Sequence, residues 1–178
     1  MSATREYPPT DAGPFPEPPA EIDDREGRSI RLASATEADV DGLVAMYRDF
    51  DPAQRAQGVP PSDPDRVEPW VRTVLDAGCH VVARHEDRIV GHAMLVPDAD
   101  DSYELAIFVH QEYQAAGIGG ALIRHLLGAG EAAGVHRVWL TVERWNAPAI
   151  RLYRSVGFET VLADRFDLEM ALALPEAA

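Results

Sequence analysis

The segment from residue 103 to residue 127 constrains the fold of this chain more than any other. Residues 103–109 form a β-type run, and a turn that is first polar and then glycine-rich follows. Apolar residues then recur at the spacing of an amphipathic helix, at Leu122, Ile123, Leu126 and Leu127. The unpaired N–H groups and the macrodipole of a helix N-terminus favour a bound anion, and glycines let the anion approach the backbone. The segment therefore predicts a phosphate-binding turn at residues 114–120.

Two common nucleotide-binding patterns do not match this turn. The dinucleotide pattern G-x-G-x-x-G requires glycine where the chain has Leu122, and no acidic residue follows about twenty positions later at the end of a clear second strand. The Walker pattern requires a lysine, and the chain contains none. The pattern that remains is Q-x-x-G-x-G at residues 114–119, which resembles the acyl-CoA pyrophosphate loop of the GNAT superfamily of N-acetyltransferases.

A second motif lies about thirty residues downstream, after the β-type run at residues 137–142. Residues 146–158 resemble the N-x-x-A-x-x-L-Y-x-x-x-G-F signature of the same superfamily and match it at every fixed position. Asn146 is expected to cap a short helix that tolerates Pro148 in its first turn, and Gly157 suits the left-handed position that ends it. The order of the two motifs, each in a strand–turn–helix setting, identifies the chain as a member of the GNAT superfamily by resemblance.

The resemblance implies an α/β GNAT fold, with a mixed and mostly antiparallel sheet and about four flanking helices. The central parallel pair, at residues 103–109 and 137–142, is expected to splay around acetyl-CoA. Hydrophobic periodicity predicts the remaining elements: strands at 29–32, 79–85, 88–96 and 165–174, and helices at 40–47 and 67–75. The domain is expected to span residues 29–178. Residues 1–28 carry six prolines between Pro8 and Pro19 and then a charged run, and are expected to form a flexible, acidic tail.

The resemblance also implies acetyl-CoA as the cofactor, with CoA as product. The residues implied to hold it are Ile107, Phe108, Val109, Gln114, Ala115, Ala116, Gly117, Ile118, Gly119, Gly120, Ala121, Asn146, Ala149 and Tyr153. In this set a backbone N–H of residues 107–109 polarises the thioester carbonyl as an oxyanion-type donor. Tyr153 occupies the position of the acid that protonates the leaving thiolate; the alternative is an amphipathic core tyrosine.

Glu104 is the candidate general base, because it is the one carboxylate in an otherwise apolar strand and burial there raises its pKa. Residues 104–109 resemble the E-F-A-V-x-V strand of the Pat-type protein lysine acetyltransferases, whose strand glutamate is regarded as the base. The arginine–tyrosine pairing of that group is not reproduced, and no CoA-ligase-like or nucleotide-sensing domain is expected. A strand-end carboxylate without a catalytic role is the alternative.

Composition narrows the partners and the location. Thirty acidic residues against 16 basic ones, all arginine, give a net charge of −14, which disfavours nucleic acid. The acidic residues are spread along the chain, which favours a surface adapted to high salt over a face that attracts cationic substrates. No apolar stretch reaches the ~18 residues of a membrane span, and no signal peptide is evident. A single cysteine, Cys79, fits a reducing interior, so a cytoplasmic location is expected. The scattered histidines predict no metal site.

The predicted function is acetyl-CoA-dependent transfer of an acetyl group to a primary amine, directly in a ternary complex. A protein lysine is favoured as acceptor only by the Glu104 strand, and small-molecule amines remain open. The alternative from another class is a non-catalytic regulator that binds acetyl-CoA. The resemblance places the acceptor pocket at residues 46–72 and 160–165, which carry no readable motif. Dimers are frequent in the superfamily, so the resemblance is compatible with a homodimer and leaves the oligomeric state open.

Overall fold

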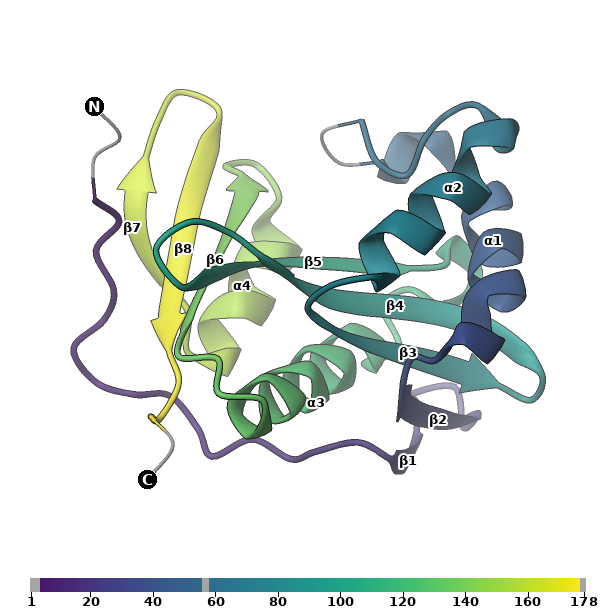
Figure 1. Ribbon diagram of the computed structural model, residues 1–178, viewed down its shortest axis with the longest axis horizontal. Helices are drawn as coiled ribbons and strands as arrows, with labels where there is room; N and C mark the ends of the chain where they lie inside the picture. Colours follow the sequence, from purple (N-terminus) through teal and green to yellow (C-terminus); the bar gives the residue numbers. More distant parts are fainter. Residues whose placement is uncertain (1–3, 56–57, 177–178) are drawn as a thin grey trace.

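A single mixed sheet organises the computed structural model, which describes residues 4–55 and 58–176 (Figure 1). Within these residues the sheet has eight strands in the order β1-β2-β3-β4-β5-β6-β8-β7. Their bounds are β1 Ala20–Asp23, β2 Ser29–Ser34, β3 Cys79–His85, β4 Arg88–Pro97, β5 Ser102–Val109, β6 Arg137–Glu143, β7 Glu159–Ala163 and β8 Asp167–Ala173. Every neighbouring pair is antiparallel except β5 and β6. The predicted mostly antiparallel sheet with one central parallel pair is confirmed.

Four α-helices of the described residues cover the two faces of this sheet, as predicted: α1 Val40–Arg48, α2 Pro64–Leu75, α3 Ile118–Ala132 and α4 Ala147–Val156. In Figure 1, α1 and α2 lie above β3 and β4, while α3 lies on the opposite side. Each face has its own hydrophobic core. One core packs α1 and α2 against Val82, Met94 and Phe108. The other packs α3 and α4 against alternate residues of the same strands, such as Val81, Leu95 and Leu105. The period of two in the strands therefore divides the molecule into two sides.

The parallel pair is joined over a short length only. Ser102, Tyr103 and Glu104 of β5 pair with residues 137–139 of β6, and the pairing ends there. Beyond that point β5 stays paired with β4 up to Val109, and β6 stays paired with β8 up to Glu143. Figure 1 shows the two strands separating. Two half-sheets thus meet at three positions and then open a gap, which is the splay that the sequence resemblance implied.

The N-terminal segment differs from the expectation of a tail that ends at residue 28. Residues 20–23 form β1, which pairs with β2 through four register positions. Further contacts tie this segment to the domain: the Arg25 N–H donates to the carbonyl of Ala116 at 2.9 Å, and the Ala12 N–H donates to the carbonyl of Ala173 at 2.7 Å. The β1 residues Ala-Glu-Ile-Asp alternate between half-buried and exposed, but four residues beside a proline-rich segment are too few for that alternation to predict a strand. The sheet therefore begins before residue 29, and flexibility of the segment in solution stays a prediction.

The length and hydropathy of the helices bear on whether one of them could span a membrane. Across residues 4–55 and 58–176, no helix is both long and apolar enough to cross a bilayer. The cytoplasmic location stays a prediction.

Candidate active site

The turn before α3 has the backbone geometry that its glycines predicted. Gly117 precedes the helix with a φ of +89°, and Ala115 has a φ of +58°. No side chain of the described residues caps the helix N-terminus. The N–H groups of residues 118–120 have no acceptor one turn earlier within the helix, so they are available to a ligand. The turn therefore presents a concave set of donors suited to a diphosphate.

A cleft of about 1130 Å³ extends from this turn into the gap between β5 and β6. It collects most of the predicted cofactor residues from four separate elements: Ile107, Phe108, Val109, Gln114, Ala115, Gly117, Ile118, Gly119, Gly120, Asn146, Ala149 and Tyr153. Ala116 and Ala121 do not line it. Ala116 is 2% exposed and its carbonyl faces Arg25, so it supports the turn from behind. The second motif contributes because Asn146 caps α4, accepting a hydrogen bond from the Ala149 N–H at 3.3 Å.

The cleft fits the cofactor that the motifs implied. A Cβ atom at Gly120 would lie 3.3 Å from Leu152, so glycine lets the first turn of α3 pack closely against α4. The helix N-terminus suits the diphosphate, and apolar side chains such as Ile107 and Leu152 suit the uncharged arm that follows it. Gln114 donates from Nε2 to the Val109 carbonyl at 3.0 Å, which fixes the end of β5 against the turn. These residues would hold the diphosphate and arm of acetyl-CoA.

Arg25 is a functional candidate that the sequence reading missed. It lies between β1 and β2, lines the cleft, and holds its Nε 3.8 Å from the place of a Cβ on Gly117. Nearby, the guanidinium of Arg28 lies 4.2 Å from the ring centroid of Tyr113 and donates to the Glu112 carbonyl at 3.3 Å. Both arginines belong to a charged run that carries no motif, so tertiary contact alone reveals them. Arg28 is paired with the buried carboxylate of Asp24 at 2.7 Å, so Arg25 is the one of the two that supplies positive charge beside the turn.

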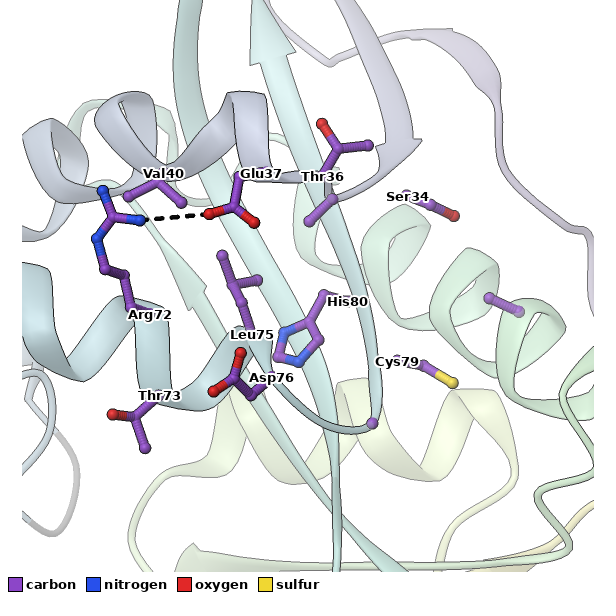
Figure 2. A pocket seen from close by; sticks show the side chains of 13 residues that line it. Ser34, Thr36, Glu37, Val40, Arg72, Thr73, Leu75, Asp76, Cys79 and His80 are labelled. Atoms are coloured by element: carbon purple, nitrogen blue, oxygen red, sulfur yellow. Dashed lines mark hydrogen bonds and ion pairs between the residues drawn. The ribbon is translucent and has the colours of Figure 1, made fainter.

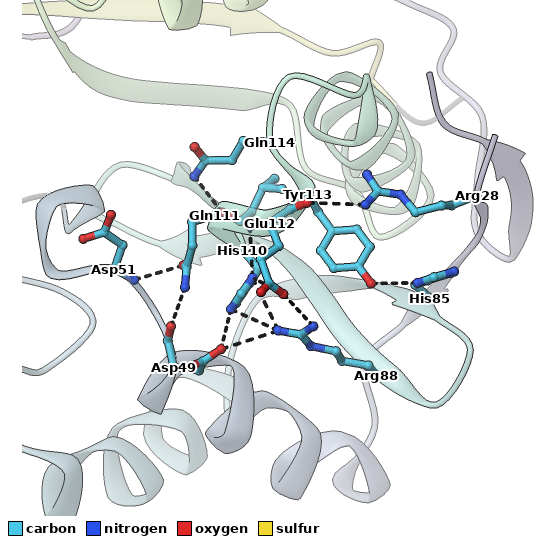
Figure 3. Close-up of polar contacts among 11 residues, drawn as sticks. Arg28, Asp49, Asp51, His85, Arg88, His110, Gln111, Glu112, Tyr113 and Gln114 are labelled. Carbon is cyan, nitrogen blue, oxygen red and sulfur yellow. Dashed lines mark hydrogen bonds and ion pairs between the residues drawn. The ribbon is translucent and has the colours of Figure 1, made fainter. Parts of the chain in front are cut away.

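A polar network fixes the loop after α1 against the segment that precedes the turn (Figure 3). The imidazole of His110 is fully buried, with Nε2 2.7 Å from a carboxylate oxygen of Asp49. Gln111 donates to the Asp49 carbonyl at 2.7 Å and accepts from the Asp51 N–H at 3.0 Å. Arg88 pairs with Glu112 at 2.9 Å. This network holds part of the expected acceptor region, which begins near residue 46, in a defined position relative to the phosphate-binding turn.

Tyr153 projects from α4 into the cleft, on the α3/α4 side of the sheet. Its ring packs edge to face on Phe158, with the centroids 5.9 Å apart. Burial raises the pKa of the Tyr153 hydroxyl to about 12, because the phenolate is poorly solvated there. The hydroxyl therefore keeps its proton at neutral pH and is available as a donor inside the cleft.

Glu104 lies on the opposite face of the sheet and does not line this cleft. It is the last residue of β5 that pairs with β6, opposite Trp139, so it stands where the gap begins. Burial raises the pKa of its carboxyl group, and the charge of Asp98 adds to that effect while Arg5 opposes it. The structure therefore separates the two predicted catalytic residues onto the two sides of the sheet, with the gap between them.

A second hollow, of about 570 Å³, lies between α2 and β3 and is lined by Arg72, Asp76, Cys79 and His80 among others (Figure 2). From it a buried chain of hydrogen bonds leads inward: His80 Nδ1 to His92 Nε2 at 3.0 Å, then His92 Nδ1 to the Tyr47 hydroxyl at 2.6 Å. Burial and the neighbouring His80 lower the pKa of His92 to about 3. Cys79 lies here, away from the cleft. In the described part of the chain, no group of three or more potential ligand side chains is placed to hold a metal ion.

Comparisons with known proteins agree with this geometry. Residues 43–158 match the model of the Acetyltransferase (GNAT) family. An uncharacterised N-acetyltransferase of Mycobacterium tuberculosis is 38% identical over 80 residues, which cover 44% of this chain and 51% of that protein. The ribosomal protein bS18-alanine N-acetyltransferase of Escherichia coli is 44% identical over 59 residues, 33% of this chain and 40% of the relative. The matches thus span about half the length of these curated relatives or less.

Similarity of fold extends over most of the chain. The crystal structure of the GNAT domain of S. lividans PAT superposes with a TM-score of 0.75 at 16% identity, covering 88% of this chain and 97% of that domain. At this identity the comparison shows a shared fold.

Proposed function

The chain belongs to the GNAT family of acetyltransferases, and we propose on that premise that it transfers the acetyl group of acetyl-CoA to a primary amine. The observation that carries the proposal is the gap between β5 and β6. It has a diphosphate-binding turn at one end, Tyr153 in its wall, and Glu104 on the opposite face where the gap begins. Donor and acceptor can therefore enter from different sides and meet in the gap.

The backbone of β5 is proposed to polarise the thioester. Acetyl-CoA when bound supplies an activated acyl group. β6 no longer pairs with β5 beyond Glu104, so the N–H groups on that edge near residues 107–109 have no partner in the sheet. Pairing with β4 on the other edge holds the backbone of β5 in place, so these N–H groups need not move as negative charge develops on the carbonyl oxygen.

Tyr153 is proposed to donate a hydrogen bond to the leaving sulfur. Its pKa of about 12 lies above that of a thiol, which is ~8.5, so complete proton transfer to the thiolate is uphill in this environment. A short hydrogen bond that stabilises the developing charge does not require that transfer. The role is thus narrower than the full proton donation that the sequence suggested.

Glu104 is proposed to accept the proton that the amine releases. The amine nitrogen must be neutral to attack, and a carboxylate with a raised pKa is a better base than an ordinary surface glutamate. Glu104 lies on the α1/α2 side, away from the cofactor turn, which is where the acceptor would approach. Cys79 lies in the other hollow, so direct transfer to the amine is favoured over a covalent acetyl-cysteine.

The acceptor is proposed to be an amine carried by a protein. Support comes from the names of the relatives, one of which acts on an alanine of a ribosomal protein, and from the resemblance of the Glu104 strand to protein lysine acetyltransferases. A lysine side chain and a protein N-terminus remain the two candidates.

The test measures binding of acetyl-CoA by calorimetry and release of CoA with a thiol reagent. Four acceptors are compared: a peptide with one lysine and a blocked N-terminus, a peptide with a free N-terminal alanine and no lysine, a polyamine, and an amino-acid amide. CoA release with either peptide supports the proposal. Binding without release for any acceptor would favour a regulator, and no binding at all would overturn the function.

A further inference from the structure

Arg5 lies on the acceptor side of the sheet in a small cluster of acidic and aromatic side chains. Its guanidinium carbon is 3.7 Å from the centroid of the Trp139 ring, and Nη2 is 3.0 Å from a carboxylate oxygen of Glu169. Glu104 stands opposite Trp139 in the register of β5 and β6, so its carboxylate shares this face of the sheet. The side chains of Trp139, Glu169 and Glu104 come from β6, β8 and β5, and are here called the cation cluster.

The chemistry of the cluster is that of a site for a positively charged side chain. An aromatic face attracts a cation through its quadrupole, and a carboxylate beside it adds an ion pair. The charges of Asp98 and Glu169 both raise the pKa of Glu104, so the cluster carries surplus negative charge that Arg5 only partly balances. The ion pair is partly shielded, since the side chains of Arg5 and Glu169 are 21% and 24% exposed.

Arg5 fits this cluster incompletely. Among the described residues, its Nε and the Nε1 of Trp139 are both buried without a hydrogen-bond partner. Each such group loses its hydration without compensation, which weakens the contact. The segment that carries Arg5 is held to the sheet backbone at Ala12, seven positions along the chain. The unpaired Nε–H of Arg5 weakens its hold, so a cation whose donors are all paired can displace it; the indole N–H of Trp139 needs an acceptor, which no cation supplies.

The cluster adjoins the gap in which transfer is proposed to occur. Glu104 and Trp139 face each other at the last paired position of β5 and β6. Glu169 of β8 lies opposite Thr141, which follows Trp139 by two residues in β6, toward the gap. Thr141 itself lines the cofactor cleft. A molecule that enters the gap from the acceptor side therefore passes over the cluster.

We propose that the cation cluster binds a positively charged side chain of the acceptor, next to the amine that reacts, and that Arg5 occupies this subsite until the acceptor displaces it. The role of this subsite in catalysis rests on the proposed acetyltransferase function, whereas the binding of a cation to the cluster does not depend on it. Glu169 makes the ion pair, which leaves Glu104 free to act as the base.

The first experiment tests the subsite without turnover. N-acetyl-arginine amide, which has no reactive amine, is titrated into Arg5→Ala protein, and binding is followed through the indole N–H resonance of Trp139. We expect binding about tenfold tighter than to the parent protein, as for a gain of one charge-assisted contact. The double variant Arg5→Ala/Glu169→Gln should lose that gain. Equal binding to all three proteins, or a resonance that does not shift, overturns the subsite.

The second experiment tests the role in catalysis. Two acceptor peptides differ by one arginine or citrulline beside the reactive amine, and kcat and KM are measured for each. Arg5→Ala is expected to lower KM about tenfold for the arginine peptide only. Arg31→Ala, an exposed arginine in β2, is the matched control and should change neither. An equal change for both peptides would mean that Arg5 acts only on general access. If neither peptide is acetylated, the proposed function fails, while the titration still decides the subsite.

Discussion

The two sides of the sheet build their sites in different ways. On the α3/α4 side, the backbone of one continuous segment at residues 114–120 forms the turn that we propose binds the diphosphate. On the α1/α2 side, the cation cluster combines side chains from β5, β6 and β8 with a residue near the N-terminus. A site made of backbone requires specific residues at short spacing, so it leaves a motif. A site made of side chains from distant segments leaves none.

The two sides also differ in charge. Arg25 and the N-terminus of α3 make the cofactor side locally positive. Glu104, Glu169 and Asp98 make the acceptor side negative. In a chain with a net charge of −14, the local arrangement therefore decides which ligand each side attracts.

The largest effect is expected on the acceptor side, from Glu104→Gln. We expect kcat/KM to fall at least ~100-fold at neutral pH, which is typical for loss of a general base, with acetyl-CoA affinity unchanged. Because burial raises the pKa of Glu104, activity of the parent protein should fall as the pH drops through that raised value, where the carboxylate takes up a proton. The variant should lose this acidic limb of the kcat/KM profile.

Glu159→Gln is the matched control, because this glutamate is exposed in β7 at the edge of the sheet. If Glu104→Gln keeps the kcat/KM of the parent protein and the same fall at acidic pH, Glu104 is not the general base.

An effect on stability is expected from His92 in the α1/α2 core. Its pKa is about 3 in the folded protein, against ~6.5 when unfolded, so the unfolded state binds the proton more tightly. The contribution of neutral His92 to the free energy of unfolding is therefore fully present above pH ~6.5. It is lost as the pH falls toward 3, and the loss is roughly 3–5 kcal/mol in total. Denaturant unfolding at a series of pH values should show this slope, and His92→Gln should flatten it.

His125→Gln on α3 is the control and should keep the slope of the parent protein, because this histidine lies on the other side of the sheet, bonded to the Ala121 carbonyl at 2.8 Å. An unchanged slope in His92→Gln would show that other groups govern acid unfolding.

The smallest expected effect lies on the cofactor side, from Arg25→Ala. Loss of one charged contact to the diphosphate should weaken acetyl-CoA binding about tenfold, measured by calorimetry, with kcat unchanged at saturation. Arg31→Ala is the control: this arginine is exposed in β2, pairs with Glu21 and does not line the cleft, so its loss should leave affinity unchanged. An affinity that does not respond to Arg25→Ala would mean that the backbone alone binds the donor, which would sharpen the contrast between the two sides.

Sequence patterns predicted the sheet and the four helices well, because these depend on period and on short motifs. Most of the residues predicted to hold the cofactor line one cleft, and their role stays a prediction. Gly117 and Asn146 stand where their conformations require them. The prediction missed β1, whose apolar–polar alternation covers only four residues and becomes a strand through its pairing with β2. It also missed Arg25, which reaches the turn only through the β1–β2 pairing.

The sequence by itself determined the half of this protein proposed to bind the donor: the GNAT fold, the glycine-rich turn before α3 and the helix that carries Tyr153. These follow from glycine conformations, capping and hydrophobic periodicity, all of which act over a few residues. Only the tertiary structure decided that Glu104 and Tyr153 lie on opposite faces and that Arg5 meets Trp139 and Glu169. Strand pairing places residues 35 positions apart, such as Glu104 and Trp139, side by side, and the N-terminal segment brings Arg5 to a residue 164 positions away. No local pattern records which side chains will then share one face.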